Sequence, residues 1–325
     1  MSHSNDRLRP THELDRRTFV KLVGSGAVAG AVAASAPSAF AAPTPQSRAE
    51  TFVKRLYDSF TPAQRKIVCL PFDDPRRRRI HPNWHVTEPQ IGDDFFTNDQ
   101  RELITEILKS VTTEEGFERF LKQMDDDNGG MEAYSMAIFG EPGKGKFQWE
   151  MTGRHLTIRA DGDSVDKAAF GGPIVYGHGE EEPSDNLFHY QTKMANEVFA
   201  ALDARQRKEA LLPKAPRETA VPIQGPDGKF PGVPVGELSS DQRKLLEKTV
   251  RVMLQPYRKE DVDEVMEILK AGGGFEKLCI AFYQQGDLKN DKVWDIWRVE
   301  GPNFVWHFRG APHVHTYLNI GIVDG

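Results

Sequence analysis

A short pattern that begins helices occurs four times in the chain, in two pairs with the same spacing. In each copy a Ser, Thr or Asp is followed three residues later by Gln and then by Arg, at Thr61–Gln64, Thr97–Gln100, Asp203–Gln206 and Ser239–Gln242. This is the capping box, in which the first side chain accepts a backbone N–H of the first helical turn and the glutamine returns a bond. The two glutamines of each pair are 36 residues apart. The matched spacing predicts an internal duplication.

Apolar and aromatic segments follow the helices of each half and favour β-strands. They are Tyr134–Phe139, Phe147–Trp149 and His155–Arg159 in the first half, and Leu278–Tyr283, Val293–Val299 and Phe304–Phe308 in the second. A Gly-containing turn joins the first two segments of each set, which is typical of a hairpin. We therefore predict an α+β fold of two pseudo-repeated halves, about residues 50–195 and 196–325, each with helices and a small antiparallel sheet, packed together. A period of about 140 residues indicates a duplicated domain and not a solenoid.

The N-terminus has the layout of a twin-arginine (Tat) export signal. Arg16 and Arg17 precede an apolar stretch rich in Gly and Ala, and Ala39-Phe40-Ala41 has the A-x-A form of a cleavage site. The alternative is a membrane anchor, but residues 22–36 are shorter than the ~20 apolar residues that span a bilayer. We expect residues 1–41 to be removed and residues 42–325 to form a single duplicated domain in the periplasm or outside the cell, without stable membrane insertion.

The net charge and the cysteines limit the partners and the chemistry. Residues 1–41 carry five of the basic and three of the acidic side chains, so their removal changes the net charge from −6 to −8. An acidic chain does not neutralise phosphates, so we expect a small-molecule substrate and no nucleic acid. Cys69 and Cys279 lie in apolar runs, which favours buried thiols, although an oxidising compartment would also allow a disulfide.

The stretch Pro312-His313-Val314-His315 suggests a metal site. Alternate residues of an extended strand point to the same side, roughly 6.6 Å apart, and their imidazoles can meet on one ion. An H-x-H pair alone is weak evidence, since the same spacing also occurs on a half-exposed strand face. Motifs of common hydrolases and nucleotide enzymes, such as G-x-S-x-G, the P-loop and H-E-x-x-H, are absent from the sequence.

Two further histidines strengthen the metal hypothesis. His155 lies on the matching strand of the first half, so packing of the two halves would bring it towards His313 and His315. His178 is flanked by Gly177 and Gly179, which would let the backbone turn sharply and present the ring in a cleft. Tat export also handles folded proteins and is often used for proteins that acquire a cofactor before export. We expect His155, His313 and His315 to bind a transition metal, zinc or copper, and His178 to be a fourth ligand or a catalytic acid or base.

Three long strings carry a resemblance to a known family: "MTGRHLTIRADGDSVDKAAFGGPIVYGHG", "LDARQRKEAL" and "VWDIWRVEGPNFVWHFRGAPHVHTYLNIG". The chain resembles a bacterial family catalogued as a domain of unknown function, frequent in planctomycete-like genomes and often carried by Tat-exported proteins. Its Gly-His-His-Leu motif matches Gly153-Arg154-His155-Leu156, so only the second histidine carries over, and its His-x-His matches His313 and His315. An Arg-Asp-Pro segment of many members is replaced here by residues 318–320. The resemblance implies the domain limits, from about Tyr57 to Gly321, and no particular reaction.

Two functions remain open at this point. The first is an exported metal-binding protein, and one form of it is a metal-dependent enzyme of hydrolytic or oxidative chemistry, with its site between the two halves and with Arg154 or Arg309 orienting an anionic substrate. The second is a non-catalytic binding or structural module in which the histidines satisfy hydrogen bonds and no metal binds. The two differ in whether His155, His313 and His315 meet, since metal–nitrogen bonds of about 2 Å cannot join rings more than ~10 Å apart.

Overall fold

The helices begin where the capping boxes predict. The computed structural model describes residues 42–165 and 167–323, and the predicted export signal lies outside the described residues. The α-helices of the described part are α1 (Arg48–Ser59), α2 (Pro62–Val68), α3 (Asn98–Ser110), α4 (Glu114–Asn128), α5 (His189–Ala201), α6 (Ala204–Ala210), α7 (Ser240–Leu254) and α8 (Lys259–Ala271). The four predicted cap residues precede α2, α3, α6 and α7, and in each box both reciprocal hydrogen bonds are present.

The strands form one mixed sheet. They are β1 (Cys69–Leu70), β2 (Ser135–Gly140), β3 (Phe147–Gly153), β4 (Leu156–Ala160), β5 (Ile174–His178), β6 (Leu211–Leu212), β7 (Val233–Pro234), β8 (Cys279–Tyr283), β9 (Ile296–Gly301), β10 (Phe304–Arg309) and β11 (Val314–Ile320). Their order is β1-β2-β3-β4-β5-β11-β10-β9-β8-β6, and β7 pairs with β8. The pairs are antiparallel apart from β1–β2 and β6–β8, which are parallel.

The structure confirms the α+β class and corrects the expectation of a small sheet in each half. The strands of residues 50–195 and of residues 196–325 are joined by the antiparallel pair β5–β11, which runs from His178 opposite Val314 to Ile174 opposite Leu318. Because this pairing uses backbone hydrogen bonds, the strands make one continuous sheet and not two packed ones. The predicted histidine site therefore lies along a strand pair and not between two sheet faces.

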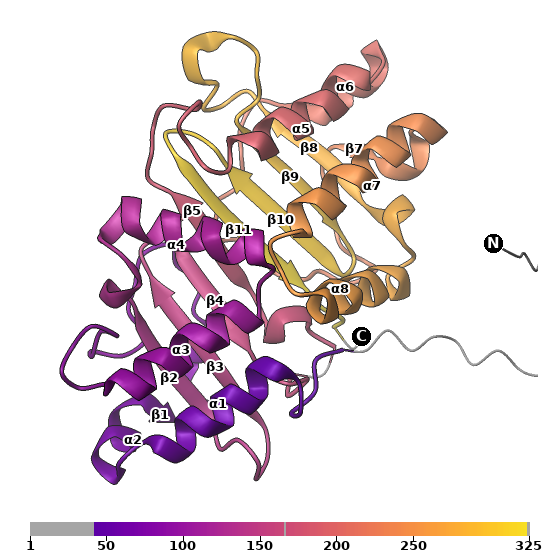
Figure 1. Ribbon diagram of the computed structural model, residues 1–325. Coiled ribbons are helices and arrows are strands. Elements are labelled where there is room, and N and C mark those ends of the chain that lie inside the picture. The colour runs from indigo at the N-terminus through magenta and orange to yellow at the C-terminus, as the bar shows by residue number, and fades with distance from the viewer. Residues whose placement is uncertain (1–41, 166, 324–325) are drawn as a thin grey trace, which may run out of the picture. The chain divides into compact units, whose positions relative to one another are not determined.

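The helices lie across one face of this sheet, as Figure 1 shows for residues 42–323. The main core combines the apolar faces of the helices with alternate residues of the strands, such as Ile174 and Tyr176 on β5 and Val314 and Leu318 on β11. The strand residues between them face the other way, because side chains alternate along a strand. Val175 and Tyr317 pack there against Val221, which belongs to the Pro-rich segment 213–236. That segment is thus part of the sheet's second covering layer.

A buried ion cluster joins the first helix to the second half of the chain. Arg258, just before α8, donates two hydrogen bonds of 2.9 and 2.7 Å to Glu50 of α1 and two of 2.9 and 3.3 Å to Asp261. All three residues are buried. Buried charges of this kind are tolerated only when they are paired and hydrogen-bonded, so this contact fixes the position of α1 against α8.

Candidate metal centre

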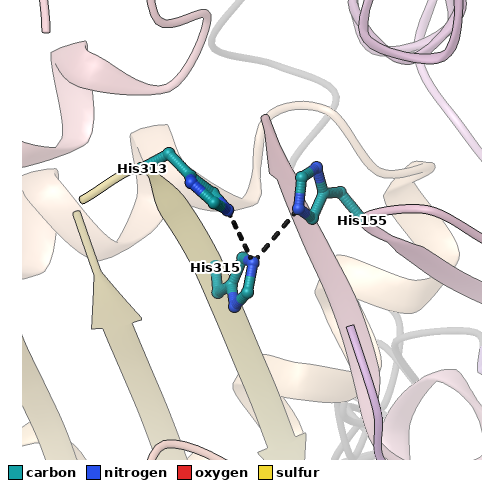
Figure 2. Close-up of side chains that lie close together, drawn as sticks. All are labelled: His155, His313 and His315. Atoms are coloured by element: carbon teal, nitrogen blue, oxygen red, sulfur yellow. Dashed lines mark hydrogen bonds between the residues drawn. The ribbon is translucent and has the colours of Figure 1, made fainter. Parts of the chain in front are cut away.

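Three histidines from distant parts of the chain meet at one point. The Nε2 atom of His315 lies 3.0 Å from Nε2 of His313 and 3.1 Å from Nε2 of His155. Three ring nitrogens, one from each histidine, all lie within 4.8 Å of one another. Figure 2 shows the ring of His315, on β11, and the ring of His313, just before that strand, directed towards the ring of His155. The structure thus brings together the three histidines that the sequence predicted to be metal ligands.

The strand pair β5–β11 positions two of these rings. His315 is the second residue of β11 and His313 lies just before its start. His315 pairs with Gly177 of β5, which has no side chain to fill the space above it. A Cβ atom at Gly177 would lie 2.2 Å from the carbonyl oxygen of Val314 and 3.4 Å from Cβ of His155. The glycine is therefore required by the close approach of the two strands and of the third histidine.

His155 lies in the tight turn between β3 and β4, one residue before the strand in which the sequence pattern placed it. Its backbone φ is 56°, the left-handed region that non-glycine residues seldom occupy. Its backbone N–H donates to the carbonyl oxygen of Pro82 at 2.6 Å. The hydroxyl of Tyr134 donates to the carbonyl oxygen of Arg154 at 2.6 Å. These two bonds hold the turn, and strain of this kind is found most often at functional sites.

Carboxylates contact the far side of two of the rings. Oδ2 of Asp127, at the end of α4, lies 2.8 Å from Nδ1 of His155. Oε1 of Glu218 lies 3.4 Å from Nδ1 of His315. A carboxylate behind the ring is the usual partner of a metal-binding histidine, because it fixes the ring's orientation and its tautomer. Both contacts leave Nε2 directed at the common point.

The two carboxyl groups are ionised at neutral pH. Burial alone would raise the pKa of Asp127, but hydrogen bonds from His155, Gln123 and the backbone of Gly179 outweigh it and lower that pKa. Burial acts in the same direction on Glu218, where the bond from His315 and the charge of Arg309 lower the pKa to about 2. An ionised carboxylate accepts hydrogen bonds and donates none. The Nδ1 atoms of His155 and His315 therefore carry the protons in their neutral rings.

This proton arrangement leaves a contact that is not a hydrogen bond. If Nδ1 is protonated in both His155 and His315, their Nε2 atoms carry lone pairs, and these face each other at 3.1 Å. A hydrogen bond needs one donor, and two lone pairs at this distance repel each other. The contact is stabilised only by a cation, either a metal ion bound by both nitrogens or an extra proton on one ring.

Burial opposes the extra proton on two of the rings. The pKa of His313 is lowered to about 4, first by burial and then by positive charge on His315, His155, Arg309 and Arg154. Burial is also the main reason why the pKa of His315 is lowered. Nδ1 of His313 is buried without a hydrogen-bond partner. At neutral pH the neutral form of these two rings is therefore favoured, which is the form that binds metals.

His178 does not join the other three. Its Nδ1 accepts the backbone N–H of Leu187 at 3.2 Å, and its Nε2 lies 3.2 Å from Oδ2 of Asp126. Both ring nitrogens thus have protein partners. Neither flanking glycine, Gly177 nor Gly179, has a positive φ, so the sharp turn expected there is not present. A Cβ at Gly179 would lie 2.6 Å from Oδ1 of Asp127, so a side chain there would displace that carboxylate.

The cysteines and His307 have structural surroundings, as the sequence suggested. Both cysteines are free, and burial raises the pKa of Cys69 to about 12 and that of Cys279 to about 11. His307 is buried on β10 and its Nδ1 accepts a bond from Nε of Arg298 at 3.3 Å. Burial, with the charge of Arg298, lowers the pKa of His307 to about 3.

Asp127 and Glu218 are residues of the candidate site that the sequence did not identify. Asp127 is the third of three consecutive aspartates, and only its position on the face of α4 towards His155 distinguishes it from Asp125 and Asp126. Glu218 lies in an irregular segment, where no periodicity indicates the direction of a side chain.

The described helices include none that is both long and apolar enough to cross a membrane.

Comparison with known proteins identifies a family and no individual relative. No curated protein and no solved structure matches the chain. The family match extends over residues 43–319, which covers the sheet, the helices and all three clustered histidines. It confirms the resemblance to a domain of unknown function. The chain therefore belongs to the family described as protein of unknown function (DUF3500).

Proposed function

We propose that the protein is an exported metalloprotein in which His155, His313 and His315 bind one transition metal ion, zinc or copper. The observation that carries the proposal is the contact between His155 and His315, whose unprotonated Nε2 atoms face each other at 3.1 Å. Nitrogens bound to one ion at about 2.0–2.1 Å lie about 3.3 Å apart when the site is tetrahedral. The two short separations, 3.0 and 3.1 Å, are close to this value. The widest pair of the set, within 4.8 Å, would close by up to about 1.5 Å on binding.

The ligand set supports a catalytic rather than a structural metal. Structural zinc sites have four protein ligands, whereas catalytic sites have three and leave one position for water or substrate. Here three imidazoles converge, and the fourth candidate, His178, uses both ring nitrogens in other bonds. A zinc ion so bound lowers the pKa of a water ligand and supports hydrolysis. The same nitrogen ligands suit copper, which would support oxidative chemistry on a small molecule.

Export of the protein and an internal duplication of its domain are also parts of the proposal. The twin arginine and the A-x-A site of residues 1–41 support Tat export to the periplasm. Support for duplication comes from the order of elements. In the first half α1, α2, β1, α3 and α4 precede β2 to β5, and in the second half α5, α6, β6, β7, α7 and α8 precede β8 to β11. Side-chain amides of Gln64 and Gln100 bond each other, as do those of Gln206 and Gln242.

The alternative is a non-catalytic module without a metal. It is favoured by the distances of 3.0 and 3.1 Å, which are also normal lengths for a hydrogen bond between two imidazoles. It requires that one ring of the cluster carry an extra proton, because both carboxylates already accept from Nδ1. That requirement makes the two functions separable by measuring metal content.

Metal content of the purified protein tests the proposal. Inductively coupled plasma mass spectrometry on wild-type protein is expected to find one zinc or copper ion per chain. The double variant His313→Ala, His315→Ala should lose it, because one remaining imidazole cannot hold the ion. His85→Ala is the matched control, since His85 is exposed and distant in sequence from the cluster. A wild type without stoichiometric transition metal, or a double variant with unchanged content, rejects the metal centre.

A further inference from the structure

We propose that the open position of this metal centre binds an oxyanion group of the substrate, a carboxylate or a phosphate, and that Arg154 and Arg309 donate hydrogen bonds to it. The inference rests on the proposed metal site and adds the chemical class of its ligand. It is based on the charges around the cluster and on guanidinium nitrogens that have no hydrogen-bond partner in the protein.

Each carboxylate that contacts a histidine of the cluster is accompanied by an arginine. Nε of Arg154 lies 3.7 Å from Oδ1 of Asp127, the residue behind His155. Nε of Arg309 lies 2.9 Å from Oε2 of Glu218, the residue behind His315. The two guanidinium charges thus balance the two carboxylate charges, and neutral imidazoles add none. A divalent ion at the centre would leave its own charge unbalanced, which favours an anionic ligand.

Arg309 is fixed beside the cluster by the sheet. It pairs with His315 across β10–β11, so both side chains leave the same face of the sheet. Its Nη2 is buried and has no hydrogen-bond partner, and its contact with Glu218 does not have the angle of a hydrogen bond. Buried donors in native proteins are nearly always bonded, so an unbonded guanidinium nitrogen beside a candidate metal site needs an acceptor.

Arg154 approaches from the other side, next to His155 in the β3–β4 turn. Its side chain is 40% exposed, so it is open to solvent while its Nε atom is buried and unbonded. Its Nη2 lies 3.0 Å from the position that a Cβ of residue 179 would have, and Cε1 of His155 lies 3.4 Å from the same position. The absence of a side chain at Gly179 thus leaves room for the guanidinium group of Arg154 beside the ring of His155.

The shared ligand chemistry follows from the shape of the donors. A guanidinium presents parallel N–H groups that match two oxygens of a carboxylate or a phosphate. A metal ion and two guanidinium groups around one point would contact an oxyanion from three sides. A neutral ligand such as an amide or an alcohol would leave the charge of the ion uncompensated.

Anion titration of the cobalt-substituted protein tests this inference. Co²⁺ replaces Zn²⁺ in histidine sites, and its visible absorption changes when a ligand enters the open position. Inorganic phosphate and acetate are the two probes, added separately to wild type, Arg154→Ala, Arg309→Lys and Arg205→Ala. Arg309→Lys keeps the positive charge beside Glu218 and removes the second donor, whereas Arg205 is 62% exposed on α6 and serves as the control.

We expect at least one probe to shift the wild-type spectrum and saturate. Arg154→Ala and Arg309→Lys should each raise its dissociation constant about tenfold or more, the effect of losing one charge-assisted hydrogen bond. Cobalt content should remain one per chain in all four proteins, and Arg205→Ala should bind like wild type. A shift with phosphate alone assigns the site to phosphate groups, and a shift with acetate alone assigns it to carboxylates.

Two results overturn the inference in distinguishable ways. If wild type binds one Co²⁺ but neither probe changes the spectrum, or both arginine variants bind the probe as wild type does, the oxyanion subsite is wrong and the metal centre stands. If wild type binds no Co²⁺ or Zn²⁺, the metal centre itself is wrong and the subsite falls with it.

Discussion

At the scale of single residues, the candidate site depends on positions other than its three histidines. Asp127 and Glu218 determine which nitrogen of His155 and of His315 is free to bind a metal. Gly177 determines whether the rings can approach at all. These three positions allow the site to be tested without removing a ligand.

Asp127→Asn is expected to weaken metal binding while the fold is kept. The change preserves the shape of the side chain but removes the charge that fixes the tautomer of His155, and loss of such a partner typically costs 10–100-fold in affinity. Competition with a fluorescent zinc chelator measures the affinity. Asp126→Asn, the neighbouring residue that contacts His178 instead, is the matched control and should bind like wild type. Equal affinities for the two variants would show that Asp127 does not support a ligand.

Gly177→Ala is expected to destabilise the protein and to lower its metal affinity together. The added Cβ would lie 2.2 Å from the carbonyl oxygen of Val314, so β5 and β11 must separate. Forced overpacking of this kind costs about 1–3 kcal/mol. Urea unfolding gives the change in stability, and Gly145→Ala is the control because nothing lies within 4 Å of a Cβ there. An unchanged midpoint for Gly177→Ala would contradict the packing described here.

The sequence predicted which three histidines meet because histidines are rare enough to be considered one by one. It could not predict that both ring nitrogens of His178 bond to other groups, since those partners, Asp126 and the backbone of Leu187, come from a helix and a loop. It could not identify Glu218 either, because the direction of a side chain in an irregular segment depends on tertiary packing. The residues that carry periodic or motif signals were thus predictable, and their supporting partners were not.

At the scale of secondary-structure elements, local rules were sufficient. A capping box satisfies backbone donors within one helical turn, so its sequence alone determines where a helix starts. All four boxes are present as predicted. The continuity of the sheet was not predictable, because the β5–β11 pair joins residues that no local pattern relates. Whether a segment forms a strand depends on its local sequence, whereas the strand that it pairs with does not.

Thr97→Ala should lower the free energy of unfolding by about 1 kcal/mol, the usual effect of removing an N-cap hydroxyl. The side chain of Thr97 accepts the backbone N–H of Gln100, and a serine can make the same bond. Chemical denaturation of Thr97→Ala and Thr97→Ser measures the difference. Equal destabilisation by both substitutions would attribute the effect to the methyl group and not to the cap.

At the scale of the whole molecule, buried carboxyl groups between the two halves make stability depend on pH. Burial, with the nearby charges of Asp161 and Asp261, raises the pKa of Glu264 from 4.5 to about 9. Burial is also the main reason why the pKa of Asp161 is raised to about 6. Neighbouring Arg258 lowers the pKa of both groups but does not outweigh burial.

The sign of the effect follows from the direction of these shifts. A carboxyl group whose pKa is raised by folding holds its proton more tightly in the folded state, so its stabilising contribution is present at low pH and lost as pH rises through the folded value. The window for Glu264 runs from about 4.5 to about 9. We predict a lower urea midpoint at pH 9 than at pH 5.5. Glu264→Gln should reduce that difference, whereas Glu267→Gln, an exposed residue of the same helix, should not. Equal pH dependence in both variants would contradict this assignment.

We propose that three imidazoles from distant parts of the chain bind one ion, and X-ray absorption spectroscopy of the zinc-loaded protein measures that coordination itself. We predict three imidazole nitrogens at about 2.0–2.1 Å and one further light ligand. In His155→Ala the imidazole number should fall to two. A zinc shell of oxygen ligands without imidazole scattering, or a shell unchanged in His155→Ala, would contradict it.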